Sequence, residues 1–141
     1  MLIDKTGHIF HVDFGYIFGK EPPAKKILAP PIRICKEMLE TMGGPKDENY
    51  KIFLQKCVES FLYLRNHQRY ILNLFYIMIH SGIKDLGQDY DKVLTQMHEK
   101  FMPNLSNIDA EKEFVNIIKE SVNAFFPKLL EKIHEWALYM K

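Results

Sequence analysis

The sequence has few of the residues and patterns that define several common protein classes. Only two cysteines, Cys35 and Cys57, occur in 141 residues, they form no C-x-x-C pair, and the six histidines show no ligand spacing. We therefore expect buried, reduced thiols and no zinc site. The longest apolar run covers only residues 70–79 and contains Asn73, so it is too short to span a bilayer.

Neither positive nor negative charge is in excess in this sequence. Nineteen Lys and Arg residues balance eighteen Asp and Glu residues, which leaves a net charge of +1. Because a nucleic-acid-binding domain usually carries a strongly basic face, we expect no nucleic-acid partner. Residues 1–7 contain Asp4 and no apolar core of a secretory signal. These features predict a cytoplasmic protein that contacts membranes only peripherally.

What the chain does have is apolar content, at 47% of residues, which is enough for a folded core. Residues 2–4 and 8–12 are expected to form two short strands of a hairpin, with Gly7 providing the positive φ of the turn. Residues 16–33 hold four prolines and clustered lysines. That composition resists both helix and sheet, so we predict a long, ordered and functional loop there.

The remainder is predicted to be helical. The expected helices cover residues 34–42, 47–66, 68–80, 89–101, 106–126 and 127–141. Gly43 and Gly44 should end the first helix, and Asp89 and Ser106 should cap later ones. Residues 68–80 are apolar nearly all round, which predicts a central buried helix. The fold class is therefore mainly α, with a short β-hairpin, a loop and about six helices.

Asp13, Phe14 and Gly15 follow the second predicted strand. A carboxylate at the mouth of a strand is a suitable oxygen ligand for Mg²⁺ in phosphoryl transfer. Val12 would then face a flat apolar ligand. The alternative is an aspartate that ends a strand and binds nothing, and three letters alone do not decide between the two.

The order of the motifs resembles the C-terminal lobe of the phosphatidylinositol 3-/4-kinase superfamily, most closely the class III phosphatidylinositol 3-kinases. The resemblance rests on F-H-V-D-F-G, K-E-M followed by M-G-G, and I-L-N-L-F, and it extends over essentially the whole chain. It implies a partial catalytic domain over residues 1–141: a hairpin with D-F-G (1–15), an activation loop (16–33) and a helical part (34–141). The implied activity is transfer of the γ-phosphate of ATP to the 3-hydroxyl of phosphatidylinositol, with Mg²⁺ or Mn²⁺, in endosomal trafficking and autophagy.

The resemblance also implies roles for individual residues. Asp13 corresponds to the metal ligand, and Leu2 and Val12 correspond to apolar residues under the adenine ring. The loop cations that would face the lipid headgroup are Lys20, Lys25, Lys26 and Arg33. Because these loop cations are few, they suit the single phosphodiester charge of unphosphorylated phosphatidylinositol. The alternative for each lysine is that it only keeps an exposed loop soluble.

Residues 126–141 form an amphipathic pattern, with apolar positions at spacings of three and four. One interpretation is a terminal helix docked on the core. The other is membrane contact, because the side chains near its end suit the headgroup interface. The residues expected to touch the membrane are Trp136, Tyr139 and Met140.

No Asp-Arg-His triplet, which carries the catalytic loop in this family, occurs in the sequence, so the chain alone is expected to be inactive. By resemblance, the parent enzyme acts on endosomal and autophagic membranes with a kinase-like regulatory subunit and a beclin-type coiled-coil protein. Two alternatives stay open. One is a part of a phosphatidylinositol 4-kinase or a related protein kinase. The other is a non-catalytic helical module that binds membranes or partners.

Overall fold

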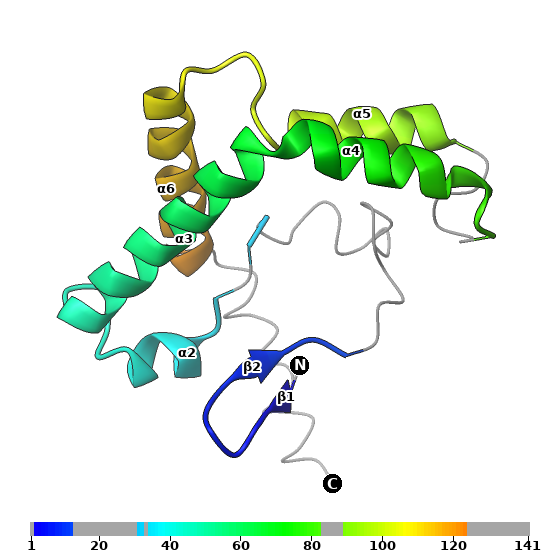
Figure 1. Ribbon diagram of the computed structural model, residues 1–141. Helices are drawn as coiled ribbons and strands as arrows, with labels where there is room; N and C mark the ends of the chain where they lie inside the picture. The colour runs from blue at the N-terminus through cyan, green and yellow to red at the C-terminus, as the bar shows by residue number, and fades with distance from the viewer. Residues whose placement is uncertain (1, 13–30, 33, 83–88, 124–141) are drawn as a thin grey trace, which may run out of the picture.

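A computed structural model describes residues 2–12, 31–32, 34–82 and 89–123, and the described part is mainly helical (Figure 1). Two strands, β1 (Leu2–Ile3) and β2 (Ile9–Phe10), form a hairpin. The α-helices are α2 (Lys36–Thr41), α3 (Glu48–Asn66), α4 (Gln68–Ile77), α5 (Tyr90–Glu99) and α6 (Asn107–Asn123), and a 3₁₀ turn, η1 (Met78–His80), extends α4. The predicted class is confirmed, whereas the predicted helix over 127–141 lies outside the described residues.

The hairpin forms where the sequence predicts it, with shorter strands. β1 and β2 are antiparallel, with Leu2 opposite Phe10 and Ile3 opposite Ile9. The Gly7 N–H donates to the Asp4 carbonyl at 3.1 Å, so Asp4 already belongs to the turn. Gly7 has φ of +89°, which confirms its predicted role because glycine adopts this conformation without steric cost.

The end of α2 follows from its two glycines. Gly43 and Gly44 have φ of +80° and +91°. The Gly44 N–H donates to the Leu39 carbonyl and the Gly43 N–H to the Glu40 carbonyl, both at 2.9 Å. These are the two hydrogen bonds of a Schellman motif, which satisfies the last carbonyls of a helix. The turn then delivers Asp47, whose side chain accepts the Asn49 N–H at 2.9 Å and caps α3.

The core lies mainly between α3 and α6, which contact each other where they cross in Figure 1. Its buried apolar side chains are Ile34, Tyr50, Val58, Phe61, Val93, Ala110 and Ile118. The start of α6 is capped as predicted, because the Asp109 N–H donates to Ser106 Oγ at 3.1 Å. The Ser106 hydroxyl donates in turn to the Asp109 carboxylate at 2.6 Å.

Three predictions fail in the structure. α4 has no buried residue, so the prediction of a central buried helix is wrong. Its apolar surface would need cover on every side, and among the described elements α4 packs mainly on α5. α5 begins at Tyr90 as expected, but the Asp89 side chain makes no capping hydrogen bond because its backbone (φ −128°, ψ 44°) is not extended like that of a normal cap.

The cysteines are the third case. Cys35 and Cys57 are free, as predicted, but each is half-buried and not fully buried. Partial burial raises the pKa of the Cys57 thiol.

Among the described residues, no helix has the length and apolar character needed to cross a bilayer.

Candidate functional site

The predicted site residues divide into those that the structure describes and those that it does not. Leu2 and Val12 lie on or just after the hairpin and are described. The rest lie outside the described residues: Asp13, Lys20, Lys25, Lys26, Arg33, Trp136, Tyr139 and Met140. Their roles therefore stay predictions, and the site can be built only as far as the strand that leads to Asp13.

The hairpin presents apolar side chains on both faces. Leu2 and Phe10 are partners across the two strands, so their side chains share one face. Ile3 and Ile9 share the other face. All four are exposed, and so is Val12, two residues after Phe10. An exposed apolar surface of this kind can contact a flat ring, which is what the predicted adenine-binding role of Leu2 and Val12 requires.

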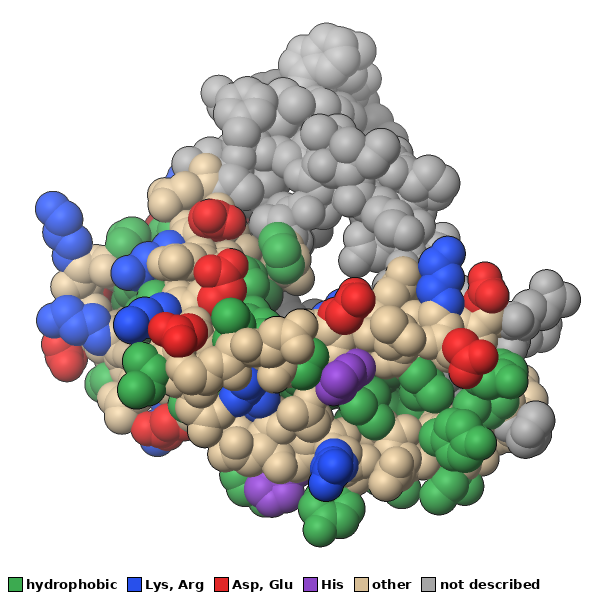
Figure 2. Space-filling view, turned by 90° about the horizontal axis from the view of Figure 1, so that it is seen from above, with side chains coloured by type: hydrophobic (Ala, Val, Ile, Leu, Met, Phe, Trp, Pro, Cys, Tyr) green, Lys and Arg blue, Asp and Glu red, His purple; other side chains and the backbone are tan. Residues whose placement is uncertain are grey.

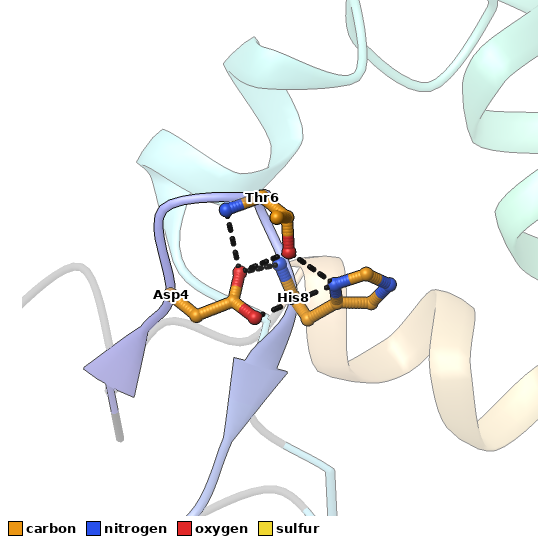
Figure 3. Close-up of polar contacts among 3 residues, drawn as sticks. All are labelled: Asp4, Thr6 and His8. Carbon is orange, nitrogen blue, oxygen red and sulfur yellow. Dashed lines mark hydrogen bonds and ion pairs between the residues drawn. The ribbon is translucent and has the colours of Figure 1, made fainter.

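The hairpin turn is held by a side-chain network that joins Asp4, Thr6 and His8 (Figure 3). Asp4 Oδ1 accepts hydrogen bonds from the Thr6 N–H at 2.8 Å, the Thr6 hydroxyl at 2.7 Å and the His8 N–H at 2.9 Å. His8 Nδ1 lies 2.7 Å from Thr6 Oγ1 and 3.5 Å from Asp4 Oδ2. These contacts stabilise one turn geometry and with it the register of the hairpin.

The same contacts change the titration of Asp4. Its pKa lies below the ordinary value, first because of the hydrogen bond from the Thr6 hydroxyl and next because of the bond from the His8 N–H. This network is not among the features predicted from the sequence. The sequence does contain an indication of it, because an aspartate followed two residues later by threonine and then by glycine is typical of an Asx turn.

Arg65 is a second structurally important residue that is not predicted from the sequence. It is buried on α3, and its guanidinium binds the loop between α5 and α6. Nε donates to the Phe101 carbonyl at 2.9 Å and a terminal nitrogen to the Met102 carbonyl at 3.2 Å. Further hydrogen bonds reach the Leu105 carbonyl and Asn107 Oδ1. Arg65 thus positions a loop in which Met102 has a positive φ of 54°.

An apolar hollow of about 340 Å³ lies where α3, α5 and α6 meet. Its lining residues are Phe61, Met97, Lys100, Phe101 and Phe114. The rings of Phe61 and Phe114 stack there, with centroids 4.2 Å apart and planes inclined by 8°. Neither Leu2 nor Val12, the two predicted site residues within the described part of the chain, is among the residues that line the hollow.

The described residues do not form a metal site by themselves. No group of three or more His, Cys, Asp or Glu side chains among them could hold a metal ion. Carboxylate oxygens are the ligands that Mg²⁺ prefers. The one residue predicted as a metal ligand is Asp13, directly after the described hairpin segment. Asp13 lies outside the described residues, so its role as a metal ligand stays a prediction.

Comparison with known proteins identifies the family. The family model described as phosphatidylinositol 3- and 4-kinase matches residues 1–88, from the hairpin past α4. The nodule isoform of phosphatidylinositol 3-kinase from Glycine max is 41% identical over 141 residues, which is 100% of this chain and 17% of that protein. Phosphatidylinositol 3-kinase pik3 of Schizosaccharomyces pombe is 40% identical over the same span, again 17% of its length.

A third relative extends the range of organisms. Phosphatidylinositol 3-kinase VPS34 of Saccharomyces cerevisiae is 36% identical over 141 residues, which is 100% of this chain and 16% of that protein. The chain therefore spans about one-sixth of the length of the curated relatives that it matches. Since the family model matches more than half of the residues and these relatives align with all of them, the chain belongs to the phosphatidylinositol 3- and 4-kinase family.

Proposed function

We propose that the chain forms part of the catalytic domain of a phosphatidylinositol 3-kinase, which transfers the γ-phosphoryl group of ATP to the 3-hydroxyl of phosphatidylinositol. The observation that carries the proposal is alignment over all 141 residues with proteins that are each named phosphatidylinositol 3-kinase. The order of the elements supports it, because an exposed apolar hairpin leads directly into Asp-Phe-Gly.

In this proposal the hairpin is the floor of the nucleotide site. Leu2 and Val12 contact the adenine ring, and both are exposed apolar side chains. Asp13, the next residue, supplies a carboxylate ligand to the divalent cation, Mg²⁺ or Mn²⁺. The cation, when bound, neutralises charge on the nucleotide phosphates. The Asp4 network supports this arrangement because it stabilises the register of the hairpin, and Val12 follows β2 by two residues.

The lipid headgroup is assigned to the loop that follows. Lys20, Lys25, Lys26 and Arg33 are its cations, and they bind the phosphodiester of phosphatidylinositol. The membrane contact is assigned to the end of the chain, where Trp136, Tyr139 and Met140 enter the headgroup region. The kinase-like regulatory subunit, the beclin-type coiled-coil protein and the cytoplasmic face of endosomal and autophagic membranes belong to the same proposal.

A chimera tests the proposal. The segment of the Glycine max nodule isoform that matches this chain is replaced by the 141 residues, and phosphorylation of phosphatidylinositol is measured. We expect 3-phosphorylated product. Asp13→Ala should lower turnover roughly a hundredfold or more, because it removes a metal ligand. The matched control, Asp91→Ala, removes an exposed carboxylate from the first turn of α5 and should keep near-normal turnover.

The other outcomes decide between the alternatives. A 4-phosphorylated product would favour the phosphatidylinositol 4-kinase interpretation. A folded but inactive chimera would favour a non-catalytic module. The 141-residue chain by itself should show no turnover, because the sequence contains no Asp-Arg-His. Turnover by the isolated chain that disappears in Asp13→Ala would contradict that expectation.

A further inference from the structure

Five side chains form a line along α3 and α4, which we call the α3–α4 stripe: Tyr63, His67, Tyr70, Leu74 and Ile77. They are separated by four, three, four and three residues, the spacing that places side chains along one helix face that packs against a second helix. The stripe continues across the junction of the two helices. The His67 ring centroid lies 4.4 Å from that of Tyr63 and 6.3 Å from that of Tyr70.

The stripe is exposed although it is apolar and aromatic. Tyr63, Tyr70, Leu74 and Ile77 are 66, 72, 61 and 74% exposed. The neighbouring Leu64, Tyr76 and Met78 are exposed as well. Figure 2 shows hydrophobic side chains gathered over the end of the molecule that α4 and α5 form. Contiguous apolar patches of this kind mark interaction sites, whereas single exposed apolar residues do not.

Charge is nearly absent from this surface. Between residues 63 and 79 the only charged side chains are Arg65 and Arg69. Arg65 is buried and its guanidinium is bound to the loop between α5 and α6. Arg69 is the single exposed cation of this segment. Depletion of charge with enrichment of tyrosine is typical of the core of a protein interface. It is atypical of a membrane surface, for which a cluster of basic residues would be expected.

We propose that the α3–α4 stripe is the surface on which the remaining part of a phosphatidylinositol 3-kinase polypeptide packs, through the apolar face of a helix. The relatives supply the reason for this occupant. They are about six times as long as this chain and carry the matched segment within one polypeptide. The stripe extends over fifteen residues, from Tyr63 to Ile77, and at the rise of a helix this corresponds to a path of about 21 Å, which is enough for one helix–helix contact.

The inference rests on the family and on the length of the relatives, and not on phosphoryl transfer. The experiment that tests it measures the accessibility of a thiol and not kinase activity. Failure of this inference can therefore be distinguished from failure of the proposed activity. Leu74→Cys is introduced in the isolated chain and in the Glycine max chimera. Reaction with a maleimide is followed at that position by peptide-resolved mass spectrometry. The matched control is Ile108→Cys, on a residue of α6 that is 67% exposed and lies outside the stripe.

The thiol introduced by Leu74→Cys should react at least tenfold more slowly in the chimera than in the isolated chain, because the packed polypeptide excludes the reagent. The rate for Ile108→Cys should change less than threefold. Equal rates for Leu74→Cys in the two proteins would overturn the proposal. Circular dichroism of each cysteine variant verifies that it is folded, since an unfolded variant would react fast in either protein.

A stability comparison provides the second measurement. Leu74→Glu with Ile77→Glu should leave the melting temperature of the isolated chain nearly unchanged, because both positions are exposed there. In the chimera the same pair should lower the melting temperature by roughly 5 °C or more. The control pair, Ile52→Glu with Ile108→Glu, also replaces exposed aliphatic residues and should have little effect in either protein.

Two further results would assign the stripe to another occupant and so contradict the proposal. One is a dimer of the isolated chain in sedimentation equilibrium that Leu74→Glu dissociates, since a second copy would then cover the stripe. The other is protection of Leu74→Cys in the chimera only after phosphatidylcholine–phosphatidylinositol vesicles are added.

Discussion

Arg65 on α3 donates from Nε to the backbone carbonyl of Phe101, 36 residues away, at 2.9 Å. A terminal nitrogen of the same guanidinium donates to the backbone carbonyls of Met102 and Leu105. One buried cation therefore satisfies several carbonyls of the loop that connects α5 to α6. This contact joins the end of α3 to the beginning of α6, the two helices that form most of the core.

Replacing Arg65 should destabilise the fold. Arg65→Met keeps much of the side-chain volume but leaves the loop carbonyls without a donor, which should cost about 2–4 kcal/mol of unfolding free energy. Chemical denaturation followed by circular dichroism measures the loss. Arg69→Met is the matched control, since Arg69 is exposed, and should change the free energy by less than about 0.5 kcal/mol. Similar stabilities of the two variants would show that the Arg65 contacts contribute little.

The Thr6 hydroxyl should control the titration of Asp4. The pKa of Asp4 lies below its ordinary value of 3.8, so the ionised carboxylate stabilises the folded hairpin above that pH. The contribution is lost as the pH falls through the lower, folded-state pKa. Thr6→Val removes the largest cause of the shift and should raise the pKa of Asp4 toward 3.8.

Carboxyl-carbon NMR titration of the isolated chain tests this prediction. Thr95→Val, at an exposed position on α5, is the control and should leave the Asp4 titration unchanged. An unaltered Asp4 pKa in Thr6→Val would mean that the hydrogen bond in Figure 3 does not lower it.

The two glycines after α2 should differ in their tolerance of alanine. Both have positive φ, which costs an alanine roughly 1–2 kcal/mol. A Cβ added to Gly43 would also lie 2.5 Å from Cγ of Asp47, and Asp47 is the residue that caps α3. A Cβ added to Gly44 would have no atom within 4 Å. Gly43→Ala should therefore lower the melting temperature more than Gly44→Ala. The reverse order would show that Asp47 moves away without cost.

The activation-loop lysines are predicted to act on the lipid and not on the nucleotide. In the chimera, Lys25→Glu with Lys26→Glu should lower lipid phosphorylation more than hydrolysis of ATP in the absence of lipid. Lys92→Glu with Lys119→Glu reverses two exposed helical lysines and serves as the charge-matched control. Equal loss of both activities in the loop variant would indicate that these lysines do not bind the headgroup.

Trp136, near the end of the chain, is predicted to act at the membrane surface. In the chimera, Trp136→Ala should lower activity on phosphatidylinositol vesicles several-fold more than activity on short-chain dispersed lipid, because the indole is assigned to the membrane interface. Both substrates are measured with one preparation. An equal loss on both, together with a lower melting temperature, would instead identify residues 126–141 as part of the core.

The sequence by itself determined the local features of this protein. The turn at Gly7, the glycine end of α2 and the Ser106 cap all appear where the sequence predicts them. Each depends on contacts between residues fewer than six positions apart, so neighbouring letters contain the necessary information. The family was also readable, because F-H-V-D-F-G and I-L-N-L-F stand in a characteristic order.

Only the tertiary structure decided what each helix packs against. No local sequence pattern marks Arg65 as buried, yet it is buried, because acceptors 36 to 42 residues further along the chain meet its guanidinium. α4 looked like a central helix, yet Leu74 and Ile77 are exposed. Apolar periodicity reports which face of a helix requires cover, whereas the cover itself depends on where distant segments lie. For α4 we infer that this cover comes from the rest of a longer kinase polypeptide.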